Sequence, residues 1–534
     1  MSYSDKVQAS RNSAYDTAIA NKIIDMMQEL KLKNDEKTAC RWIWELIQNA
    51  KDVADDTKGV NIEVEFNEKE KYLAFKHDGK NFTTDNIVHL ISQVSSKERN
   101  PDSNSEVTGK FGTGFLTTHL LSEKVKVKAY LKDEDEPLKK IDILLDRSGE
   151  TKEEVITAVN ESFWQLESSQ EMNTPVSSEN RGFDTCFFYE LDNNGIETAK
   201  NGLENLYISI PYVFAFVKKV NSIRINHSFY VQRGEKRAVG NMEIHSVYIT
   251  DSENQRVNEI LLYHGETIDL AIPIKHRDGE VLVEEYPKKM PKLFCAFPLI
   301  GTEDFSFPVV VNSTFFNPNE PRSGIYLTDK ENKVIDENKG LMLQALNSYK
   351  ELLDYAASHN WKQLYNIVHV PKQPDKDWIS KDWFGSIIKD CKEHIKCASI
   401  FDTIGGERTA LFDFCDCQDV LIIGDSEKAT RELVWEMGKS IYPNHMLLLS
   451  EIHRWYASLW VECRNFDVKK LVCDVEEFGS LQELEKAIKD EANSIDWLNR
   501  LYEILVTTKN TEILESAEIF PNQLGQFCGI DKLS

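Results

Sequence analysis

Three short motifs between residues 45 and 115 constrain this chain more than any other feature. Residues 45–52 read ELIQNAKD, residues 77–79 read HDG, and residues 109–115 read GKFGTGF. An acid, an amide and a second acid therefore stand at positions i, i+4 and i+7 before a short turn, and a glycine-rich loop then opens a helix. This order predicts a fold in which one polar helix face and the glycine loop converge on the same pocket.

The first motif predicts a single polar stripe on an amphipathic helix. We expect this helix from about Thr38 to Val53, because its apolar residues recur with helical spacing. At 100° per residue, Glu45, Asn49 and Asp52 fall within about 60° of one another. Taken alone, such a stripe is most often a solvated helix face, so its meaning depends on the two motifs that follow.

The second motif ends a predicted strand. Strands are expected at 60–66 and 71–77, where apolar residues alternate with polar ones. A carboxylate at Asp78 can accept a hydrogen bond from the exocyclic amine of adenine, and Gly79 lets the backbone pass close to a flat ring. An Asp-Gly pair is also typical of a simple hairpin turn.

The third motif has the composition of a phosphate-binding loop. Its glycines expose backbone N–H groups, and the start of the following helix adds partial positive charge. The loop residues are Gly109, Lys110, Phe111, Gly112, Thr113 and Gly114. The loop lacks the GK[ST] of a Walker A motif and follows no βαβ unit, so it is not a dinucleotide fingerprint either.

Together the motifs offer the groups that hydrolysis of a phosphoanhydride requires. The reaction needs an oriented water, a group that takes its proton, and cations that offset the phosphate charge. Glu45 is the candidate base. The Asn49 amide offers one oxygen to Mg²⁺, whose other ligands are commonly waters and phosphate oxygens. Asp52 is expected to hold a metal-bound water.

The motifs resemble those of the GHKL ATPases, which include gyrase, the ninety-kilodalton heat-shock chaperones, histidine kinases and MutL. The family patterns ExxxNAxD and GxxGxG occur at 45–52 and 109–114. The middle pattern, DxGxG, differs, because alignment on Gly79 puts the family's aspartate at His77. Either His77 or Asp78 is then the adenine contact, and we favour Asp78 because it is a plain acceptor.

The resemblance implies further site residues. Thr185, in a predicted strand, takes the place of the family's threonine beside the adenine. Lys97 lies in a polar segment expected to act as a lid, where it is either a phosphate ligand or a solvated lysine. In related ATPases a basic residue of the second domain contacts the γ-phosphate. Arg322 is the first candidate for that role and Lys330 the second.

Within this superfamily the chain looks most like sacsin-like and MORC-like ATPases. The likeness rests on HDGxxF, which adds Phe82 to the nucleotide-binding residues, on IPYVFAFV at 210–217 and on PNQLGQF at 521–527. It is specific over about 40–190 and barely covers the C-terminal part.

The order of predicted elements gives an α+β chain of three parts. The resemblance implies that residues 1–215 form a Bergerat-type ATP-binding α/β sandwich with an N-terminal helix. Residues 216–335 are rich in strand signals and predict a separate α+β domain, which the resemblance implies is transducer-like. Residues 336–534 read as mostly helical, with one helix expected at 446–462. The abrupt, turn-rich end suggests a fragment of a longer protein.

Composition limits the partners. There are 63 Lys and Arg against 88 Asp and Glu, and the net charge of −25 argues against direct nucleic-acid binding. The ten cysteines form no CxxC pair, as in a cytosolic protein with reduced thiols. No run approaches the ~18 apolar residues of a membrane span. A cytoplasmic location without a membrane segment is therefore expected.

These features favour a slow ATPase that works by changing shape. ATP with Mg²⁺ would close the lid and bring two chains or two domains together. The expected partners are ATP and ADP, a second copy of the chain in a homodimer or larger assembly, and a protein client or effector. The alternative is a scaffold or signalling switch that holds ATP without hydrolysing it. A chaperone-like or antiviral-defence role rests on analogy alone.

Overall fold

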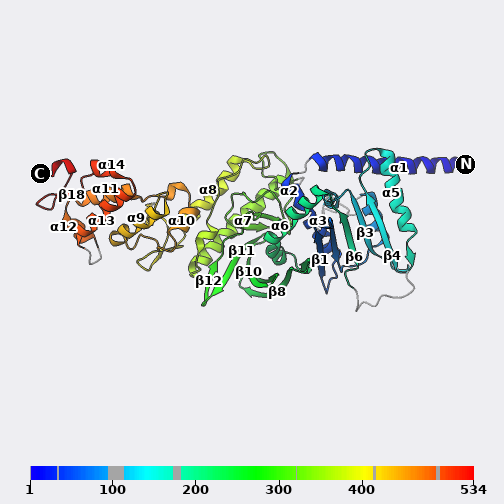
Figure 1. Ribbon diagram of the computed structural model, residues 1–534, viewed down its shortest axis with the longest axis horizontal. Coiled ribbons are helices and arrows are strands. Elements are labelled where there is room, and N and C mark those ends of the chain that lie inside the picture. The colour runs from blue at the N-terminus through cyan, green and yellow to red at the C-terminus, as the bar shows by residue number, and fades with distance from the viewer. Residues whose placement is uncertain are drawn as a thin grey trace.

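The computed structural model describes residues 2–32, 35–93, 114–171, 182–319, 322–412, 417–488 and 493–533. The molecule is elongated, with a long N-terminal helix at one end, two β-rich lobes in the middle and a helical unit at the C-terminal end (Figure 1). It is a mixed α+β structure, in agreement with the predicted fold class. Among the described residues, fifteen strands belong to one mixed sheet.

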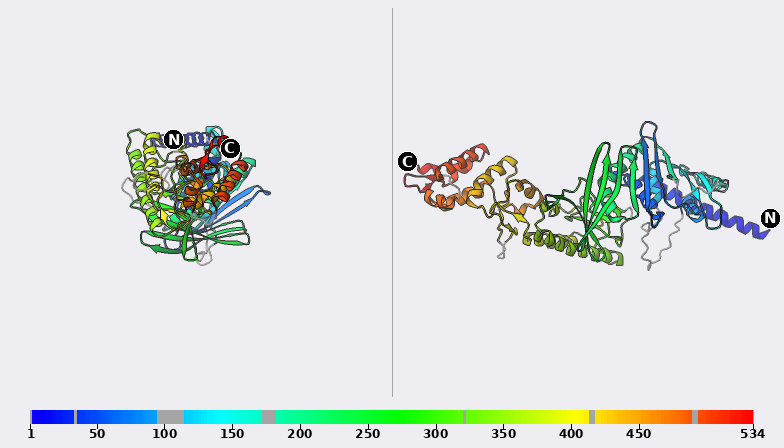
Figure 2. Two further views of the ribbon diagram at one scale, coloured as in Figure 1. Left: turned by 90° about the vertical axis from the view of Figure 1, so that its left-hand side faces the viewer. Right: turned by 90° about the horizontal axis from the view of Figure 1, so that it is seen from below.

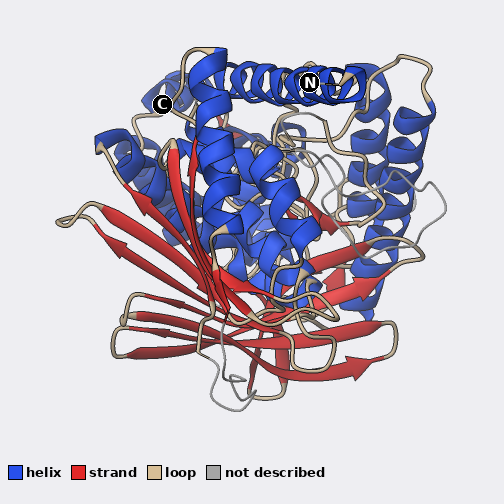
Figure 3. Ribbon diagram, turned by 90° about the vertical axis from the view of Figure 1, so that its right-hand side faces the viewer, coloured by secondary structure: helices blue, strands red, loops and turns tan. Residues whose placement is uncertain are grey.

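The N-terminal lobe contributes the strand order β7-β1-β2-β6-β3-β4-β5. Its strands are β1 (Val60–Asn67), β2 (Tyr72–His77), β3 (Lys124–Leu131), β4 (Lys139–Asp146), β5 (Gln170–Glu171) and β6 (Thr185–Glu190). Its helices are α1 (Tyr3–Leu32), α2 (Glu36–Ala39), α3 (Arg41–Asp52), α4 (Thr84–Ser92), the 3-10 helix η1 (Gly114–Leu120), α5 (Lys152–Glu167) and α6 (Asn193–Phe216). Figure 3 shows helices gathered on one side of the curved sheet.

The second lobe continues the same sheet. β7 pairs with β1 in parallel, with a bulge between Val60 and Asn61, and the order then runs β8-β9-β10-β11-β15-β13-β14 with β12 on β11. The strands are β7 (Val220–Ile225), β8 (Phe229–Val239), β9 (Met242–Asp251), β10 (Asn254–His264), β11 (Asp269–Arg277), β12 (Glu280–Val283), β13 (Leu293–Cys295), β14 (Phe297–Pro298) and β15 (Val310–Asn312). The helix α7 (Lys333–Ser358) follows and contacts β10 and β11.

The C-terminal part is a series of short helices with small strand pairs (Figure 2). Its helices are η2 (Leu364–Ile367), α8 (Lys381–Cys397), α9 (Lys428–Ile441), α10 (Ile452–Ser458), η3 (Val461–Cys463), α11 (Val468–Phe478), α12 (Leu481–Ala487), α13 (Ser494–Thr507), α14 (Thr511–Ser516) and η4 (Ile530–Lys532). Its strands are β16 (Phe401–Asp402), β17 (Arg408–Thr409), β18 (Phe520–Pro521) and β19 (Phe527–Cys528).

One predicted helix of this part is wrong. Residues 446–462 do not form one helix, because Met446 and Leu447 are buried in extended bridges to the segments at Leu421 and Thr403. Only α10 is α-helical within that stretch. Over the described part of the chain, the helices fall short of the length and continuous apolar character needed to cross a bilayer.

The central helix of the N-terminal lobe is α3, which is buried on most of its surface. Two of its tryptophans fix it to α6, since Trp42 Nε1 donates to the Thr198 carbonyl at 3.0 Å and Trp44 Nε1 donates to Asn205 Oδ1 at 2.7 Å. A Cβ on Gly202 of α6 would overlap the Trp42 indole. The two helices therefore approach closely only because position 202 carries no side chain.

Gly202→Ala is expected to lower the free energy of unfolding by about 1–3 kcal/mol, because the added methyl group must displace the Trp42 ring. The matched control is Gly340→Ala in α7, where a Cβ meets no atom within 4 Å. That control is expected to stabilise by up to about 1 kcal/mol, since alanine favours a helix interior. Denaturant unfolding measures the free energy of unfolding of both variants. Equal changes in the two would contradict the close contact between Gly202 and Trp42.

Candidate functional site

The polar stripe predicted on α3 is present, and its first acid is its most buried member. Glu45 is buried, whereas Asn49 and Asp52 are partly exposed. One turn earlier on the same helix, Arg41 Nη2 lies 3.3 Å from Glu45 Oε1. At the other end of the stripe, the Asp52 carboxylate lies 3.4 Å from Lys51 Nζ.

The end of the glycine loop lies directly against this stripe. Gly114 is the first residue of η1, and a Cβ placed on it would overlap the Glu45 carboxylate, meeting Oε2 first. No residue with a side chain fits at 114 unless Glu45 moves. The predicted residues Lys97, Gly109, Lys110, Phe111, Gly112 and Thr113 lie outside the described residues.

Arg322 reaches the same carboxylate from the second lobe. Its Nη1 lies 4.0 Å from Glu45 Oε1 and donates to Gln48 Oε1 at 3.3 Å. Its backbone has a φ of 63°, an uncommon conformation for a residue other than glycine. The second candidate, Lys330, is exposed in the segment before α7.

At the end of β2, His77 occupies the inward position. In the sheet register His77 is opposite Thr185 of β6, and both side chains are buried. The Gly79 N–H donates to His77 Nδ1 at 3.2 Å, so the proton of the neutral ring is on Nε2. Burial lowers the pKa of His77 to about 4, which keeps the ring neutral near pH 7.

Asp78, the adenine contact that we favoured from the sequence, faces the other way. It is exposed, and its carboxylate accepts from the backbone N–H of Asn61 at 2.7 Å and from Asn61 Nδ2 at 2.8 Å. The side chain is thus engaged with β1 on the outer side of the strand end. Which of Asp78 and His77 is the adenine contact stays a prediction.

The HDG turn packs against the end of α3. A Cβ on Gly79 would lie 2.9 Å from Val53 Cγ2, and the Lys80 N–H donates to the Val53 carbonyl at 2.7 Å. Phe82, three residues beyond Gly79, forms a bridge to Leu131 and is partly buried in the N-terminal core. The turn and the C-terminal end of the polar stripe are therefore neighbours.

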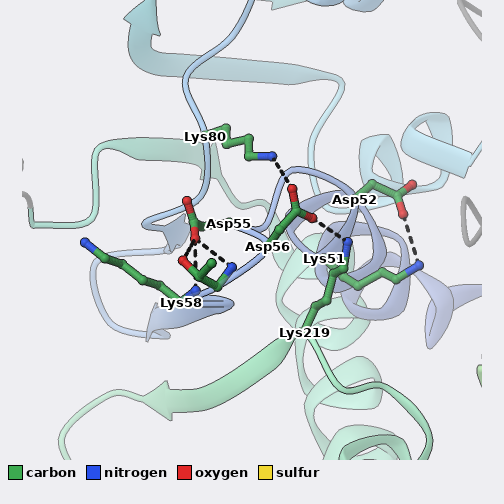
Figure 4. Close-up of polar contacts among 8 residues, drawn as sticks. Lys51, Asp52, Asp55, Asp56, Lys58, Lys80 and Lys219 are labelled. Carbon is green, nitrogen blue, oxygen red and sulfur yellow. Dashed lines mark hydrogen bonds and ion pairs between the residues drawn. The ribbon is translucent and has the colours of Figure 1, made fainter.

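An acidic loop after α3 makes ion pairs with both neighbouring segments (Figure 4). The Asp56 carboxylate pairs with Lys219 Nζ at 2.9 Å and with Lys80 Nζ at 3.2 Å, and hydrogen bonds from these two lysines lower its pKa. Asp55 closes the loop by accepting from Thr57, and its pKa falls to about 2. Lys80 belongs to the HDG turn and Lys219 precedes β7, so the loop ties the end of α3 to both.

Sequence reasoning missed Arg41 and Gln48. Gln48 is buried one turn after Trp44. Its one signal in the sequence is that it is a polar residue at a position where the helical spacing calls for an apolar one. Arg41 carries a signal only through its distance of four residues from Glu45. Within the described ranges, no three His, Cys, Asp or Glu side chains group as metal ligands. The Mg²⁺ site therefore stays a prediction based on Asn49.

The family model for histidine kinase-, DNA gyrase B- and HSP90-like ATPases matches residues 39–174. That range includes α3, the HDG turn and Gly114, so the match supports a GHKL-type ATPase domain and ATP binding by the N-terminal lobe. The match does not reach Thr185 or Arg322. No curated protein matches the chain.

His77→Asn is expected to change how stability depends on pH. Between about pH 6.5 and pH 4 the unfolded histidine binds a proton that the folded one does not, so folding loses about 1.4 kcal/mol per pH unit as the pH falls. Asparagine can still accept from the Gly79 N–H but does not titrate. In denaturant unfolding at pH 7, 6 and 5, wild type should lose stability relative to the variant. If the free energy of unfolding changed with pH equally in wild type and variant, a buried, neutral His77 would be contradicted.

Proposed function

We propose that this chain binds ATP with Mg²⁺ and hydrolyses it slowly, and that the bound nucleotide switches its conformation. The observation that carries the proposal is the position of the Glu45 carboxylate, which lies between Gly114 and Arg322. A buried acid, the end of a glycine loop and a cation from a second lobe can supply the proton acceptor and the charge stabilisation that cleavage of a triphosphate by water needs.

The residues of the stripe fit the phosphate end of ATP. Oε2 of Glu45 faces Gly114 and is the candidate proton acceptor for the attacking water. Arg322 is the candidate cation for the γ-phosphate, Asn49 the ligand of Mg²⁺, and Asp52 the group that holds a metal-bound water. Bound Mg²⁺ would offset charge on the phosphate oxygens.

The other end of the site suits adenine through His77 and Thr185 rather than Asp78. A neutral histidine with its proton on Nε2 donates a hydrogen bond, which matches a ring nitrogen of adenine. The hydroxyl of Thr185, opposite it in the register, can accept from the exocyclic amine. The missing side chain of Gly79 would let the backbone lie close to the base.

The output that we propose is mechanical. Closure of the predicted lid would create a surface for a second chain or clamp the two lobes, and the C-terminal part would act on a client or effector. These steps, the sacsin-like relationship and a cytoplasmic location rest on the sequence resemblance and composition. The N-terminal helix α1 suits exchange between subunits because it extends beyond its own lobe (Figure 1).

One observation supports the alternative of a switch that does not hydrolyse ATP. Arg41 and Arg322 lie 3.3 Å and 4.0 Å from Oε1 of the Glu45 carboxylate. If both arginines stayed there with nucleotide bound, the carboxylate would remain engaged with them instead of with a water, and ATP would be held intact.

A titration with ATP, ADP and a non-hydrolysable ATP analogue, with affinity, phosphate release and oligomeric mass as readouts, separates the two functions. An ATPase switch should bind all three, release phosphate from ATP, and change mass only with ATP or the analogue. Binding without phosphate release would establish the alternative. A chain that binds none of the three would refute both.

A further inference from the structure

We propose that Arg41 is a positioning residue for the reaction. It holds Oε1 of Glu45 so that Oε2 faces the phosphate end of the site. This inference rests on the proposed function, because it assigns how the candidate base is oriented.

The two oxygens of the Glu45 carboxylate have different surroundings. Oε1 lies 3.3 Å from Arg41 Nη2 and 4.0 Å from Arg322 Nη1, so both cations approach the same oxygen. Oε2 is the oxygen nearest to a Cβ built on Gly114. Oε1 is therefore hydrogen-bonded to Arg41 and lies near Arg322, whereas Oε2 lies against Gly114 at the end of the glycine loop.

The contact between Arg41 and Glu45 is shielded from water. The side chains are 11% and 9% exposed, so the pair is screened less than a surface ion pair. A carboxylate buried to this extent needs a cation or hydrogen-bond donors, because an unpaired buried charge is strongly destabilising. Arg41 satisfies that need from within the same helix.

Helix stability gives no reason for an arginine at this position. Arg41 is the first residue of α3, where the helix dipole disfavours a cation. An i,i+4 pair with the cation before the acid is also the weaker of the two orientations. The contact with Glu45 gives a physical reason for an arginine at this position.

Arg41 and Arg322 differ in what they can do when nucleotide binds. Arg322 comes from the second lobe and is the candidate for the γ-phosphate, so its contact with Glu45 would be exchanged for one with phosphate. Arg41 stays one helical turn from Glu45 whatever the lobes do. Arg41 would thus keep the Glu45 carboxylate paired and in the same orientation after Arg322 has exchanged this contact for one with phosphate.

Arg41→Gln tests the inference in the full chain with ATP and Mg²⁺. We expect kcat to fall about 10–100-fold, because the base is no longer held in a reactive orientation. Affinity for a non-hydrolysable ATP analogue should stay within about twofold of wild type. Arg41→Lys should recover part of kcat, since its ammonium can still reach Oε1. Lys37→Gln, which removes an exposed cation from the neighbouring helix α2, is the charge-matched control and should leave kcat unchanged.

A second variant guards against misfolding. Arg41→Met keeps an apolar stem without the charge, and it should reproduce the loss in kcat. If the wild type hydrolyses ATP and the folded Arg41→Gln or Arg41→Met variant has the same kcat, this inference is overturned and the proposed ATPase stands. A loss confined to nucleotide affinity would overturn it as well. A wild-type chain without turnover would refute the proposed hydrolysis and this inference together.

Discussion

Glu45→Gln is expected to lower phosphate release by about 10²–10⁴-fold while leaving the affinity for ATP nearly unchanged. Glutamine has the shape of glutamate, and its carbonyl oxygen can still accept from Arg41, so the buried position stays filled and hydrogen-bonded. It cannot take a proton from water, which removes the base and leaves the binding residues in place. Single-turnover phosphate release and titration with a non-hydrolysable analogue measure the two quantities.

The control for this variant is Glu36→Gln, which removes an exposed acid on α2 and should leave turnover at the wild-type rate. Equal phosphate release from wild type and Glu45→Gln would exclude Glu45 as the base. A parallel loss of ATP affinity would instead indicate that the acid shapes the pocket.

Arg322→Asn is expected to lower kcat by about 10²–10³-fold, because it removes the cation that the second lobe brings to the phosphate end. Asparagine is chosen because it accepts the left-handed backbone of this position, so the fold should be retained. The loss should appear mainly in kcat if Arg322 acts in the transition state. Steady-state kinetics at saturating ATP provide the measurement.

Lys330→Asn is the matched control, since it removes the second candidate cation from the same lobe. If Lys330→Asn lowers kcat and Arg322→Asn does not, the two assignments must be exchanged. If neither changes kcat, hydrolysis does not depend on a cation from either position.

Much of the site geometry follows from local periodicity. Helical spacing alone puts Glu45 and Asn49 on one face, and the glycine at 114 indicates where a side chain cannot fit. The same reasoning applied to β2 would have favoured His77, because Leu73, Phe75 and His77 alternate along the strand and face inward together. Asp78 is the next residue and is exposed. We favoured Asp78 for its chemistry, whereas the strand period favours His77, and the choice between them stays a prediction.

Other features depend on contacts that no local pattern contains. Arg322 meets Gln48 and Glu45 only because the second lobe packs beside α3, which depends on the whole sheet. The error at 446–462 has a similar origin. An apolar segment of that length suits a helix, but Met446 and Leu447 satisfy their backbone through bridges to distant segments.

The parallel pairing of β7 with β1 has a mechanical consequence. Because the ladder of peptide hydrogen bonds passes from one lobe into the next, the lobes lack the free hinge that a bare linker would provide. Large rotation would have to break a row of those bonds, whereas twisting of the shared sheet keeps them. Small torsion rather than a wide swing is therefore the relative motion of the two lobes that this continuous β-structure permits.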